Sequence, residues 1–303
     1  MTRRELMLRA LSVGGLMACP AHATATEPNS IHRAIPSSGE RIPVIGMGTW
    51  QTFNVGNNPR LRDARCQVLG KFFEAGGTMV DSSPMYGSAE AVMGHCAAST
   101  GTPDNYFPIT KVWTDSPDEG RQQIADSFSL WRVDQFALFQ VHNLVGWQSH
   151  LPLLRELREA GKIRYIGITT SHGRRHRELL ALMKNEPIDF VQLTYNLADR
   201  EAEKELLPLA MERGIAVIAN RPFRRGTLID ALARNPLPHW AAEIGCSNLA
   251  QFLLKFIVSH PAITCAIPAT SREDHMVENM GAMLAPLPDK KLRNQMVDWL
   301  ESA

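Results

Sequence analysis

The sequence predicts an α/β protein built as a single (β/α)8 TIM barrel. Short runs of apolar and β-branched residues recur eight times, and helical patterns separate them. Strands that alternate with helices form βαβ units around a parallel sheet. The 303 residues show no division into two halves and no G-x-G-x-x-G turn after the first strand. These observations favour a closed barrel over an open, doubly wound sheet.

The predicted strands are short and mostly apolar, as buried parallel strands are. They cover residues 42–48, 78–81, 107–111, 135–142, 163–169, 190–193, 216–219 and 263–267. Leucines at helical spacing predict helices that end before Gly161 and Gly214. The longer gap between the last two strands predicts an extended loop and a helix, and residues 287–300 predict an extra C-terminal helix.

The first 25 residues are predicted to be a signal peptide. An early basic pair, an apolar stretch and small residues near the end are typical of export signals, and Arg3-Arg4 is similar to a twin-arginine signal. Residues 21–23 and 23–25 are candidate A-x-A cleavage sites. Lipid attachment at Cys19 and an uncleaved amphipathic N-terminus are the alternatives. We expect export to the periplasm.

Composition and charge exclude several classes of protein. A content of 44% hydrophobic and 21% charged residues excludes a wholly disordered chain. The balance of 32 Lys and Arg against 31 Asp and Glu argues against a broadly basic nucleic-acid binder. No apolar run reaches the ~18 residues that a membrane-spanning helix needs.

Residues 26–303 suit one barrel domain, and we expect a monomer. Without the first 25 residues the chain has 278 residues and a formal charge of −1, so the small positive excess belongs to the leader. Pro, Ser and Asn in residues 26–41 predict a linker or a small hairpin that covers the barrel floor.

Polar residues collect where the predicted strands end, the position of active sites in such barrels. Asp81 ends the second strand, Tyr86 follows it, Lys111 ends the third and His142 ends the fourth. We therefore expect these side chains to meet at one mouth. Each has a structural alternative: a helix cap for Asp81, a packed aromatic for Tyr86, a surface charge for Lys111 and a core histidine for His142.

Together the four residue types can protonate a carbonyl oxygen. A phenol has a pKa near 10, and a nearby Lys111 ammonium would lower the pKa of Tyr86. Asp81 would hold that ammonium in place, and His142 could hydrogen-bond the incoming oxygen. None of the four can supply a hydride, so the site needs a reduced cofactor.

Several segments carry a family resemblance: Gly-Met-Gly-Thr-Trp at 46–50, Val-Asp-Ser-Ser-Pro-Met-Tyr-Gly at 80–87, Thr-Lys at 110–111, Val-His-Asn at 141–143, and residues 161–167 and 267–270. From about residue 40 to residue 285 the chain resembles the aldo-keto reductases. The family implies a (β/α)8 barrel and NADPH-dependent reduction of a small aldehyde or ketone. By resemblance Tyr86 donates the proton, Lys111 tunes it, Asp81 supports the lysine and His142 orients the carbonyl.

The resemblance also implies a nicotinamide site for NADPH, with NADH as an alternative. Thr169 and Thr170 stand where the family usually has Ser-Asn facing the carboxamide, and Gln192 matches its glutamine. Asn220 replaces the tyrosine on which the nicotinamide ring commonly stacks, so this platform is lost unless Phe223 or another ring moves in.

The rest of the implied cofactor site lies in two later segments. Arg221, Pro222, Arg224 and Arg225 follow the seventh strand, where arginines could pair with a pyrophosphate or form a solvated basic loop. The residues expected at the adenosine and its 2′-phosphate are Thr270, Arg272, His275, Glu278 and Asn279. Among these, Arg272 and His275 favour NADPH.

Aromatic residues in the predicted loops are candidates for a substrate wall or for loop packing. These are Trp50 and Trp113, which we assign to the substrate, together with Phe53 and Trp147. The sequence predicts no metal site, because the cysteines form no C-x-x-C pair and His172 and His176 lack a partner motif. One disulfide is compatible with export, with its pairing open.

Two functions follow from these observations. The first is an exported NADPH-dependent reductase of aldehydes or ketones. The second is a barrel that binds NADP(H) in a regulatory role with little turnover. Asn220 and the difficulty of supplying NADPH outside the cytoplasm suggest the second.

Overall fold

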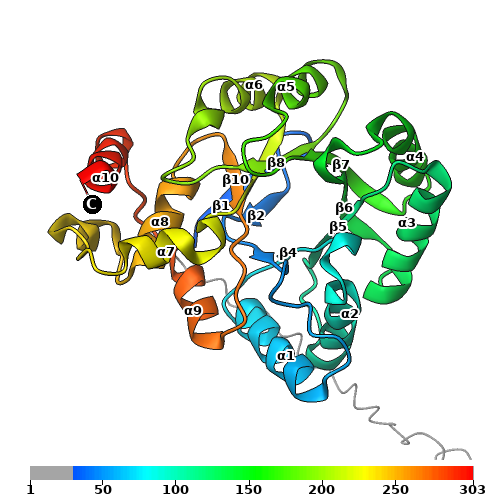
Figure 1. Ribbon diagram of the computed structural model, residues 1–303, viewed down its shortest axis with the longest axis horizontal. Helices are drawn as coiled ribbons and strands as arrows, with labels where there is room; N and C mark the ends of the chain where they lie inside the picture. The colour runs from blue at the N-terminus through cyan, green and yellow to red at the C-terminus, as the bar shows by residue number, and fades with distance from the viewer. Residues whose placement is uncertain (1–29, 303) are drawn as a thin grey trace, which may run out of the picture.

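A closed (β/α)8 barrel is formed by residues 30–302, the part of the chain that the computed structural model describes (Figure 1). The proposed signal peptide lies outside these residues. Parallel strands lie side by side in chain order. They are β3 Met47–Gly48, β4 Met79–Asp81, β5 Phe107–Val112, β6 Phe136–Val141, β7 Ile163–Thr169, β8 Phe190–Thr194, β9 Ala216–Asn220 and β10 Ile263–Ala266. The predicted fold is thus confirmed.

Backbone hydrogen bonds close the barrel between its first and last strands. The Gly46 N–H donates to the Ala266 carbonyl at 2.8 Å, and the Gly48 N–H donates to the Pro268 carbonyl at 2.9 Å. A Cβ on Gly48 would lie 3.0 Å from the Ile267 carbonyl oxygen, which favours glycine at this contact. Closure leaves the barrel without exposed strand edges.

Helices surround the barrel and alternate with its strands (Figure 1). They are α1 Pro59–Glu74, α2 Ala89–Thr100, α3 Pro117–Trp131, α4 Trp147–Glu159, α5 His176–Asn185, α6 Leu206–Arg213, α7 Thr227–Leu232, α8 Leu249–Val258, α9 Glu273–Gly281 and α10 Lys290–Ser302. Local sequence sets their ends. Asn58 caps α1 by accepting from the Leu61 N–H at 3.1 Å, and Gly214 ends α6 with a left-handed φ of 65°.

The first predicted strand is wrong in one respect. Residues 42–48 do not form one strand: β2 Arg41–Pro43 pairs antiparallel with β1 His32–Ala34, whereas the later residues of the run, including β3, pair with β4 and β10 of the barrel. Pro43 has no N–H to donate, which suits the end of a short hairpin strand. Of the two alternatives for residues 26–41, a linker or a small hairpin, the structure contains the hairpin.

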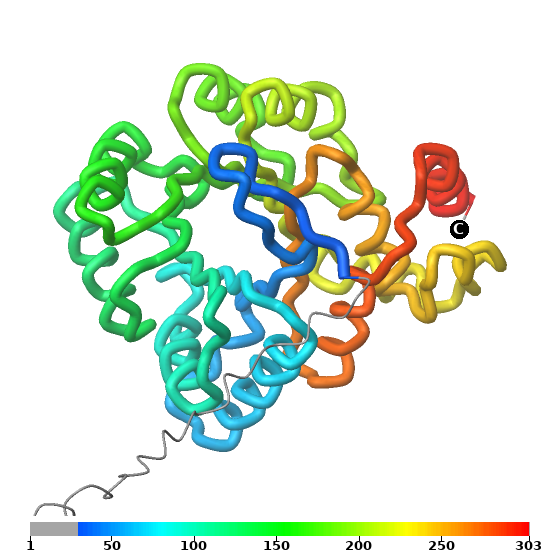
Figure 2. Tube along the Cα trace, turned by 180° about the vertical axis from the view of Figure 1, so that it is seen from behind, coloured from blue at the N-terminus to red at the C-terminus, as the bar shows by residue number. Residues whose placement is uncertain are grey.

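This hairpin covers the N-terminal end of the barrel (Figure 2). Ile35 and Ile42 are buried in one cluster with Met79, Phe107 and other residues of the barrel interior. The floor is closed by this packing, so a ligand must enter from the C-terminal ends of the strands.

Cys66 of α1 and Cys96 of α2 form a disulfide that joins the two helices. Cys246 and Cys265 are buried free thiols. Within residues 30–302, no helix is long and apolar enough to cross a membrane.

Candidate active site

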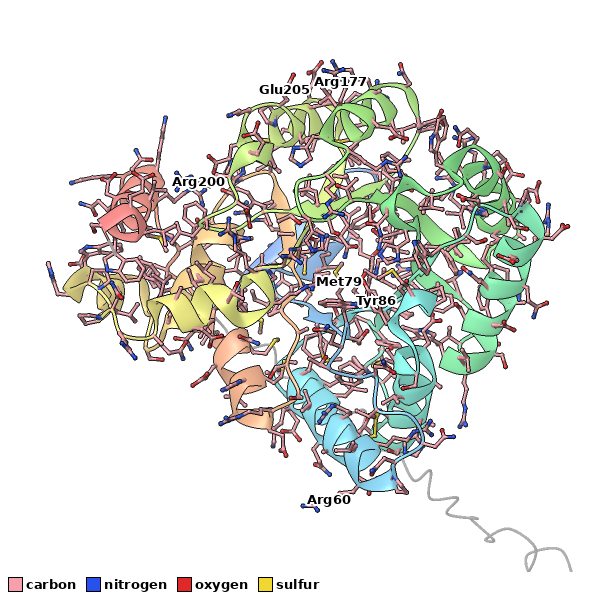
Figure 3. All side chains as sticks on the ribbon, in the orientation of Figure 1. Arg60, Met79, Tyr86, Arg177, Arg200 and Glu205 are labelled. Atoms are coloured by element: carbon pink, nitrogen blue, oxygen red, sulfur yellow. A yellow bond between two sulfur atoms is a disulfide. The ribbon has the colours of Figure 1, made fainter. Side chains whose placement is uncertain are left out.

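A cavity of about 580 Å³ opens at the C-terminal ends of the strands. Figure 3 shows Tyr86 near the middle of the ring of helices, far from surface residues such as Arg60 and Arg177. Most of the residues predicted for the site line this cavity: Trp50, Asp81, Tyr86, His142, Thr169, Thr170, Gln192, Asn220, Arg221, Pro222, Thr270, His275, Glu278 and Asn279. Lys111 is fully buried at its base, whereas Trp113 and Arg272 are not among the lining residues.

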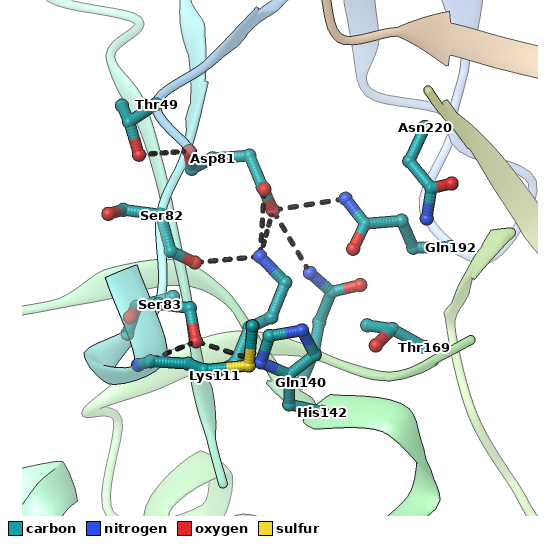
Figure 4. Close-up of polar contacts among 12 residues, drawn as sticks. Thr49, Asp81, Ser82, Ser83, Lys111, Gln140, His142, Thr169, Gln192 and Asn220 are labelled. Atoms are coloured by element: carbon teal, nitrogen blue, oxygen red, sulfur yellow. Dashed lines mark hydrogen bonds and ion pairs between the residues drawn. The ribbon is translucent and has the colours of Figure 1, made fainter. Parts of the chain in front are cut away.

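Lys111 and Asp81 form a buried ion pair between β5 and β4 (Figure 4). The Lys111 Nζ lies 2.7 Å from both carboxylate oxygens of Asp81 and 2.7 Å from the Ser82 carbonyl oxygen. An ammonium has three hydrogens, so these contacts use all of its donors. The ion pair is therefore held in one geometry.

Two glutamine amides complete the shell of Asp81. The Gln192 Nε2 donates to the Asp81 Oδ1 at 3.1 Å, and the Gln140 Nε2 approaches the same oxygen at 3.4 Å. Gln192 was expected at the nicotinamide carboxamide, and here its nitrogen contacts Asp81 while the residue also lines the cavity. Gln140 is not among the predicted site residues. Its position inside the apolar strand β6 is nevertheless a signal in the sequence, because a buried glutamine needs a polar partner.

Burial and charge pairing act in opposite directions on this ion pair. Burial raises the pKa of Asp81 and lowers the pKa of Lys111, while their mutual attraction works against both shifts. Because the carboxylate accepts from an ammonium and two amides, the pair is satisfied as ions.

Tyr86 ends the short helix η1 Pro84–Tyr86 and lies beside the ion pair. The Lys111 Nζ is 5.1 Å from the Tyr86 ring centroid. Burial, together with the negative charge of Asp81, raises the pKa of Tyr86 well above 10, so the lowering expected from Lys111 does not prevail in the free site. The ammonium is already committed to Asp81 and Ser82, so Tyr86 is a neutral phenol at physiological pH.

His142 begins the short helix η2 His142–Leu144 directly after β6. Its ring stands nearly perpendicular to the Tyr86 ring, with the centroids 5.7 Å apart. Burial, reinforced by the charge of Lys111, lowers the pKa of His142 well below 6.5. The ring is therefore neutral, and its Nδ1 lies 2.8 Å from the Ser83 hydroxyl.

On the opposite wall, Asn220 is fixed in place by its neighbours. The Thr194 hydroxyl donates to its Oδ1 at 2.8 Å, and its Nδ2 donates to the Thr170 carbonyl at 2.9 Å. Phe223 follows β9 and lines the same cavity, so the cavity contains an aromatic residue from this segment.

Two of the three arginines after β9 face the cavity. The Arg221 Nη1 lies 2.6 Å from the Nε2 of His172, and the Arg225 Nη2 lies 3.5 Å from the same atom. The Arg225 guanidinium also stacks 4.1 Å above the Trp50 ring centroid. Neither arginine forms an ion pair within the described chain.

Arg224, by contrast, is turned away from the cavity. Its Nε and Nη2 pair with the Asp199 carboxylate at 2.7 and 2.5 Å. Of the two alternatives for these arginines, a contact with a pyrophosphate is not favoured for Arg224, because Asp199 already binds this guanidinium bidentately.

Four other candidate residues, Arg272, Trp113, Phe53 and Trp147, do not line the cavity. Arg272 is exposed and pairs with Asp274, with its Nε 2.9 Å from the carboxylate, so it does not line the cavity. Trp113 is 41% exposed at the rim, with its ring 6.4 Å from that of His142. Phe53 is fully buried in the core, and Trp147 packs against that core rather than lining the cavity.

The comparisons with known proteins agree with this geometry. Residues 44–295 match the Aldo/keto reductase family. The chain is 26% identical over 268 residues to the methylglyoxal reductase YeaE of Escherichia coli, covering 86% of this chain and 92% of that protein.

Two solved structures share the fold. The thermostable aldo-keto reductase Tm1743, solved with the inhibitor epalrestat, is 25% identical with a TM-score of 0.75, over 89% of this chain and 99% of that one. An aldo-keto reductase from Klebsiella pneumoniae, solved with NADPH, is 23% identical with a TM-score of 0.73, over 88% and 94% of the two chains. The barrel, the polar strand ends and the family match lead to one conclusion: this chain belongs to the aldo/keto reductase family of oxidoreductase enzymes.

Proposed function

We propose that the protein reduces the carbonyl group of a small aldehyde or ketone with NADPH as the reductant, and that Tyr86 donates the proton. The observation that carries this proposal is the arrangement of a neutral phenol and a neutral imidazole in one cavity above a buried Lys111–Asp81 pair. NADPH bound in the cavity would supply the hydride that none of these side chains can supply.

The proton that completes the alcohol comes from the Tyr86 hydroxyl. As negative charge develops on the carbonyl oxygen, its basicity rises above that of a phenolate, so the proton moves from Tyr86 to that oxygen. The Lys111 ammonium, 5.1 Å from the ring, stabilises the phenolate that remains. Asp81 keeps the ammonium at this position and makes the buried pair neutral overall.

His142 binds the carbonyl oxygen without transferring a proton. Because its pKa is low, the ring stays neutral and offers one N–H donor to the cavity. Such a donor aimed at the developing charge favours the transition state over the substrate.

The residues present fit the proposed cofactor. Arg221 and Arg225 are guanidiniums without ion-pair partners in residues 30–302, and they lie on a wall of the cavity where a dianionic pyrophosphate would satisfy them. The side chains of His275, Glu278 and Asn279 extend the same cavity toward α9, as the adenosine would require. A structural neighbour solved with NADPH and the family resemblance favour this cofactor over NADH.

A direct test uses the mature protein without residues 1–25, NADPH, and a panel of simple aldehydes, ketones and methylglyoxal. Methylglyoxal is included because a relative carries that activity in its name. We expect oxidation of NADPH that depends on the carbonyl, and loss of this activity in Tyr86→Phe. Full activity of Tyr86→Phe would refute the assignment of the proton donor.

One observation favours the second candidate, a protein that binds NADP(H) with little turnover. Asn220 is held by two hydrogen bonds and cannot replace a stacking ring by itself. Tight NADPH binding without reduction of any carbonyl between pH 5 and 9 would support this function over the reductase.

We also propose that the protein is exported through residues 1–25 and works as a monomer in the periplasm. The Cys66–Cys96 disulfide supports the export proposal, because disulfides persist in oxidising compartments and are rare in reducing ones. Fractionation of cells that express the full chain, with an Arg3→Lys/Arg4→Lys variant as control, tests it. Equal cytoplasmic retention of both proteins would contradict export.

A further inference from the structure

One polar contact beside the reacting groups has no role in the proton transfer described above. The Ser83 hydroxyl lies 2.8 Å from the Nδ1 of His142, and Ser83 is fully buried (Figure 4). Ser83 follows β4 and His142 follows β6, so the contact joins two strand ends across the base of the cavity.

The other contact of Ser83 leaves its hydroxyl able to donate to His142. Its Oγ accepts from the Met85 N–H at 3.2 Å, as the cap of η1. The hydroxyl proton is then free to be donated, and the acceptor that the described chain places within reach is the His142 Nδ1. Nδ1 can accept because the buried ring beside Lys111 is neutral.

We propose that Ser83 is a positioning residue that holds His142 in its Nε2–H tautomer, with that N–H aimed at the substrate carbonyl. The inference rests on the proposed reductase function and deepens it. A neutral imidazole carries one proton, so an accepting Nδ1 requires a protonated Nε2. Nε2 is then the ring nitrogen left for a ligand in the cavity that His142 lines.

The same contact fixes the orientation of the ring. With Nδ1 tied to Ser83, the imidazole cannot rotate about its χ2 without losing a buried hydrogen bond, which leaves an unsatisfied group. Its edge-on geometry to Tyr86, with 83° between the ring planes, is thereby maintained. A fixed donor loses no further freedom when the carbonyl binds.

The neighbouring serine offers a matched contrast. The Ser82 hydroxyl is buried and has no hydrogen-bond partner within residues 30–302, while the Ser83 hydroxyl engages His142. Both positions can be changed to alanine with the same loss of one oxygen atom. The two variants therefore differ in whether a contact to the imidazole is removed.

Nitrogen-15 NMR of the histidine rings in the ligand-free mature protein is the first measurement, with His142 assigned from a His142→Gln spectrum. We expect the wild type and Ser82→Ala to show a protonated Nε2 and an accepting Nδ1. In Ser83→Ala the Nδ1 signal should move toward that of a nitrogen without a hydrogen bond, with the second tautomer populated. A protonated Nδ1 in the wild type, or an unchanged spectrum in Ser83→Ala, would overturn the proposal.

Steady-state kinetics is the second measurement, combined as a double-mutant cycle. We expect Ser83→Ala to lower kcat about 5- to 10-fold, the effect of losing one positioning hydrogen bond, with NADPH affinity unchanged. In a His142→Ala background the same substitution should change kcat less than about twofold, because its partner is gone. Equal losses in both backgrounds would assign Ser83 a purely structural role.

The two measurements separate this inference from the proposed function. If the NMR result is as expected and no variant, including the wild type, reduces any carbonyl, then the reductase function fails while the assignment of the tautomer stands. If the wild type is an active reductase and its His142 carries the proton on Nδ1, then the inference about Ser83 fails while the function stands.

Discussion

The two sides of the barrel mouth differ in how far their polar groups are already satisfied. At the ends of β4 and β5, the Lys111 ammonium uses three contacts, and Asp81 accepts from it and from two glutamines. At the ends of β7 and β9, Arg221 and Arg225 approach the same nitrogen of His172 and form no ion pair within the described residues. We refer to these as the proton side and the arginine side.

This difference indicates that the two sides gain binding energy from a ligand in different ways. The proton side is preorganised, since its charges are paired and its rings have fixed partners before any substrate binds. The arginine side carries like charges close together, and burial and the charge of Arg225 lower the pKa of Arg221. Binding of an anion would relieve that repulsion, so the energy gained there depends on the ligand.

The largest expected effect is on the proton side, from Tyr86→Phe. Removal of the proton donor should lower kcat/KM by about 10²- to 10⁴-fold, the range for a lost general acid. NADPH affinity, measured by fluorescence titration, should change little, because the hydroxyl serves the carbonyl. A tenfold loss of NADPH affinity would place Tyr86 in the cofactor site.

Lys111→Met tests whether the buried pair is as strongly coupled as its contacts indicate. The Asp81 carboxylate would remain buried without a counter-ion, which should lower the free energy of unfolding by about 3–5 kcal/mol. Adding Asp81→Asn in the same chain should restore part of that loss, since the stranded charge is removed. Denaturant unfolding of the two variants checks both values, and additive losses would contradict the coupling.

Removal of the Cys66–Cys96 disulfide tests how much this bridge stabilises α1 and α2, the helices that precede and follow β4 on the proton side. Cys66→Ser/Cys96→Ser should lower the free energy of unfolding by about 3.6 kcal/mol, as expected for a bridge with a sequence separation of 30 residues. Dithiothreitol should destabilise the wild type by a similar amount and leave the double variant unaffected. Equal sensitivity of both proteins to the reductant would exclude the bridge as the cause.

On the arginine side, Arg221→Ala and Arg225→Ala should each weaken NADPH binding about tenfold, as loss of a charge-assisted contact does. The affinity of the wild type should fall with added salt, and the double variant should respond less. Arg224→Ala is the matched control, because Asp199 holds that side chain outside the cavity. If Arg224→Ala weakened NADPH binding as much as the other two variants do, the distinction between Arg224 and the cavity-facing arginines would be wrong.

The smallest effect concerns pH. Because burial lowers the pKa of His142 below that of an unfolded histidine, the unfolded chain binds more protons as pH falls below about 6.5. Stability should therefore decline from pH 7 to pH 5, by at most about 1.4 kcal/mol per pH unit from this residue. His142→Gln should flatten that slope in urea unfolding, and His172→Gln, at an exposed site, should flatten it less. The opposite order would contradict the assigned burial.

The strands were predictable because each is an apolar run bounded by polar residues. The seventh run, predicted at 216–219, is β9 Ala216–Asn220, and the fifth coincides with β7. The first run failed because Pro43 interrupts backbone pairing while leaving the apolar pattern intact. A hairpin with β1 depends on a partner that periodicity does not identify.

The site residues that lie at or directly after the ends of the strands were predictable from the sequence. Asp81 ends β4, Lys111 is the second-last residue of β5 and His142 directly follows β6, so one rim brings them together. Gln140 and Ser83 could not be assigned, because an amide or hydroxyl gains its role from a partner: 59 residues separate Gln140 from Asp81 and Ser83 from His142. The three arginines after β9 were likewise equivalent in sequence, and backbone conformation and Asp199 decide which face the cavity.

By itself, the sequence determined the order of strands and helices and the residue types available for proton transfer. It also placed the polar residues at the C-terminal ends of the strands. These features depend on local periodicity and chain order. The tertiary structure decided which donor meets which acceptor. It paired Cys66 with Cys96, directed Ser83 to His142, and left Arg221 and Arg225 facing His172. Such pairings depend on distances of a few ångströms between segments far apart in the chain, and only packing of the closed barrel sets those distances.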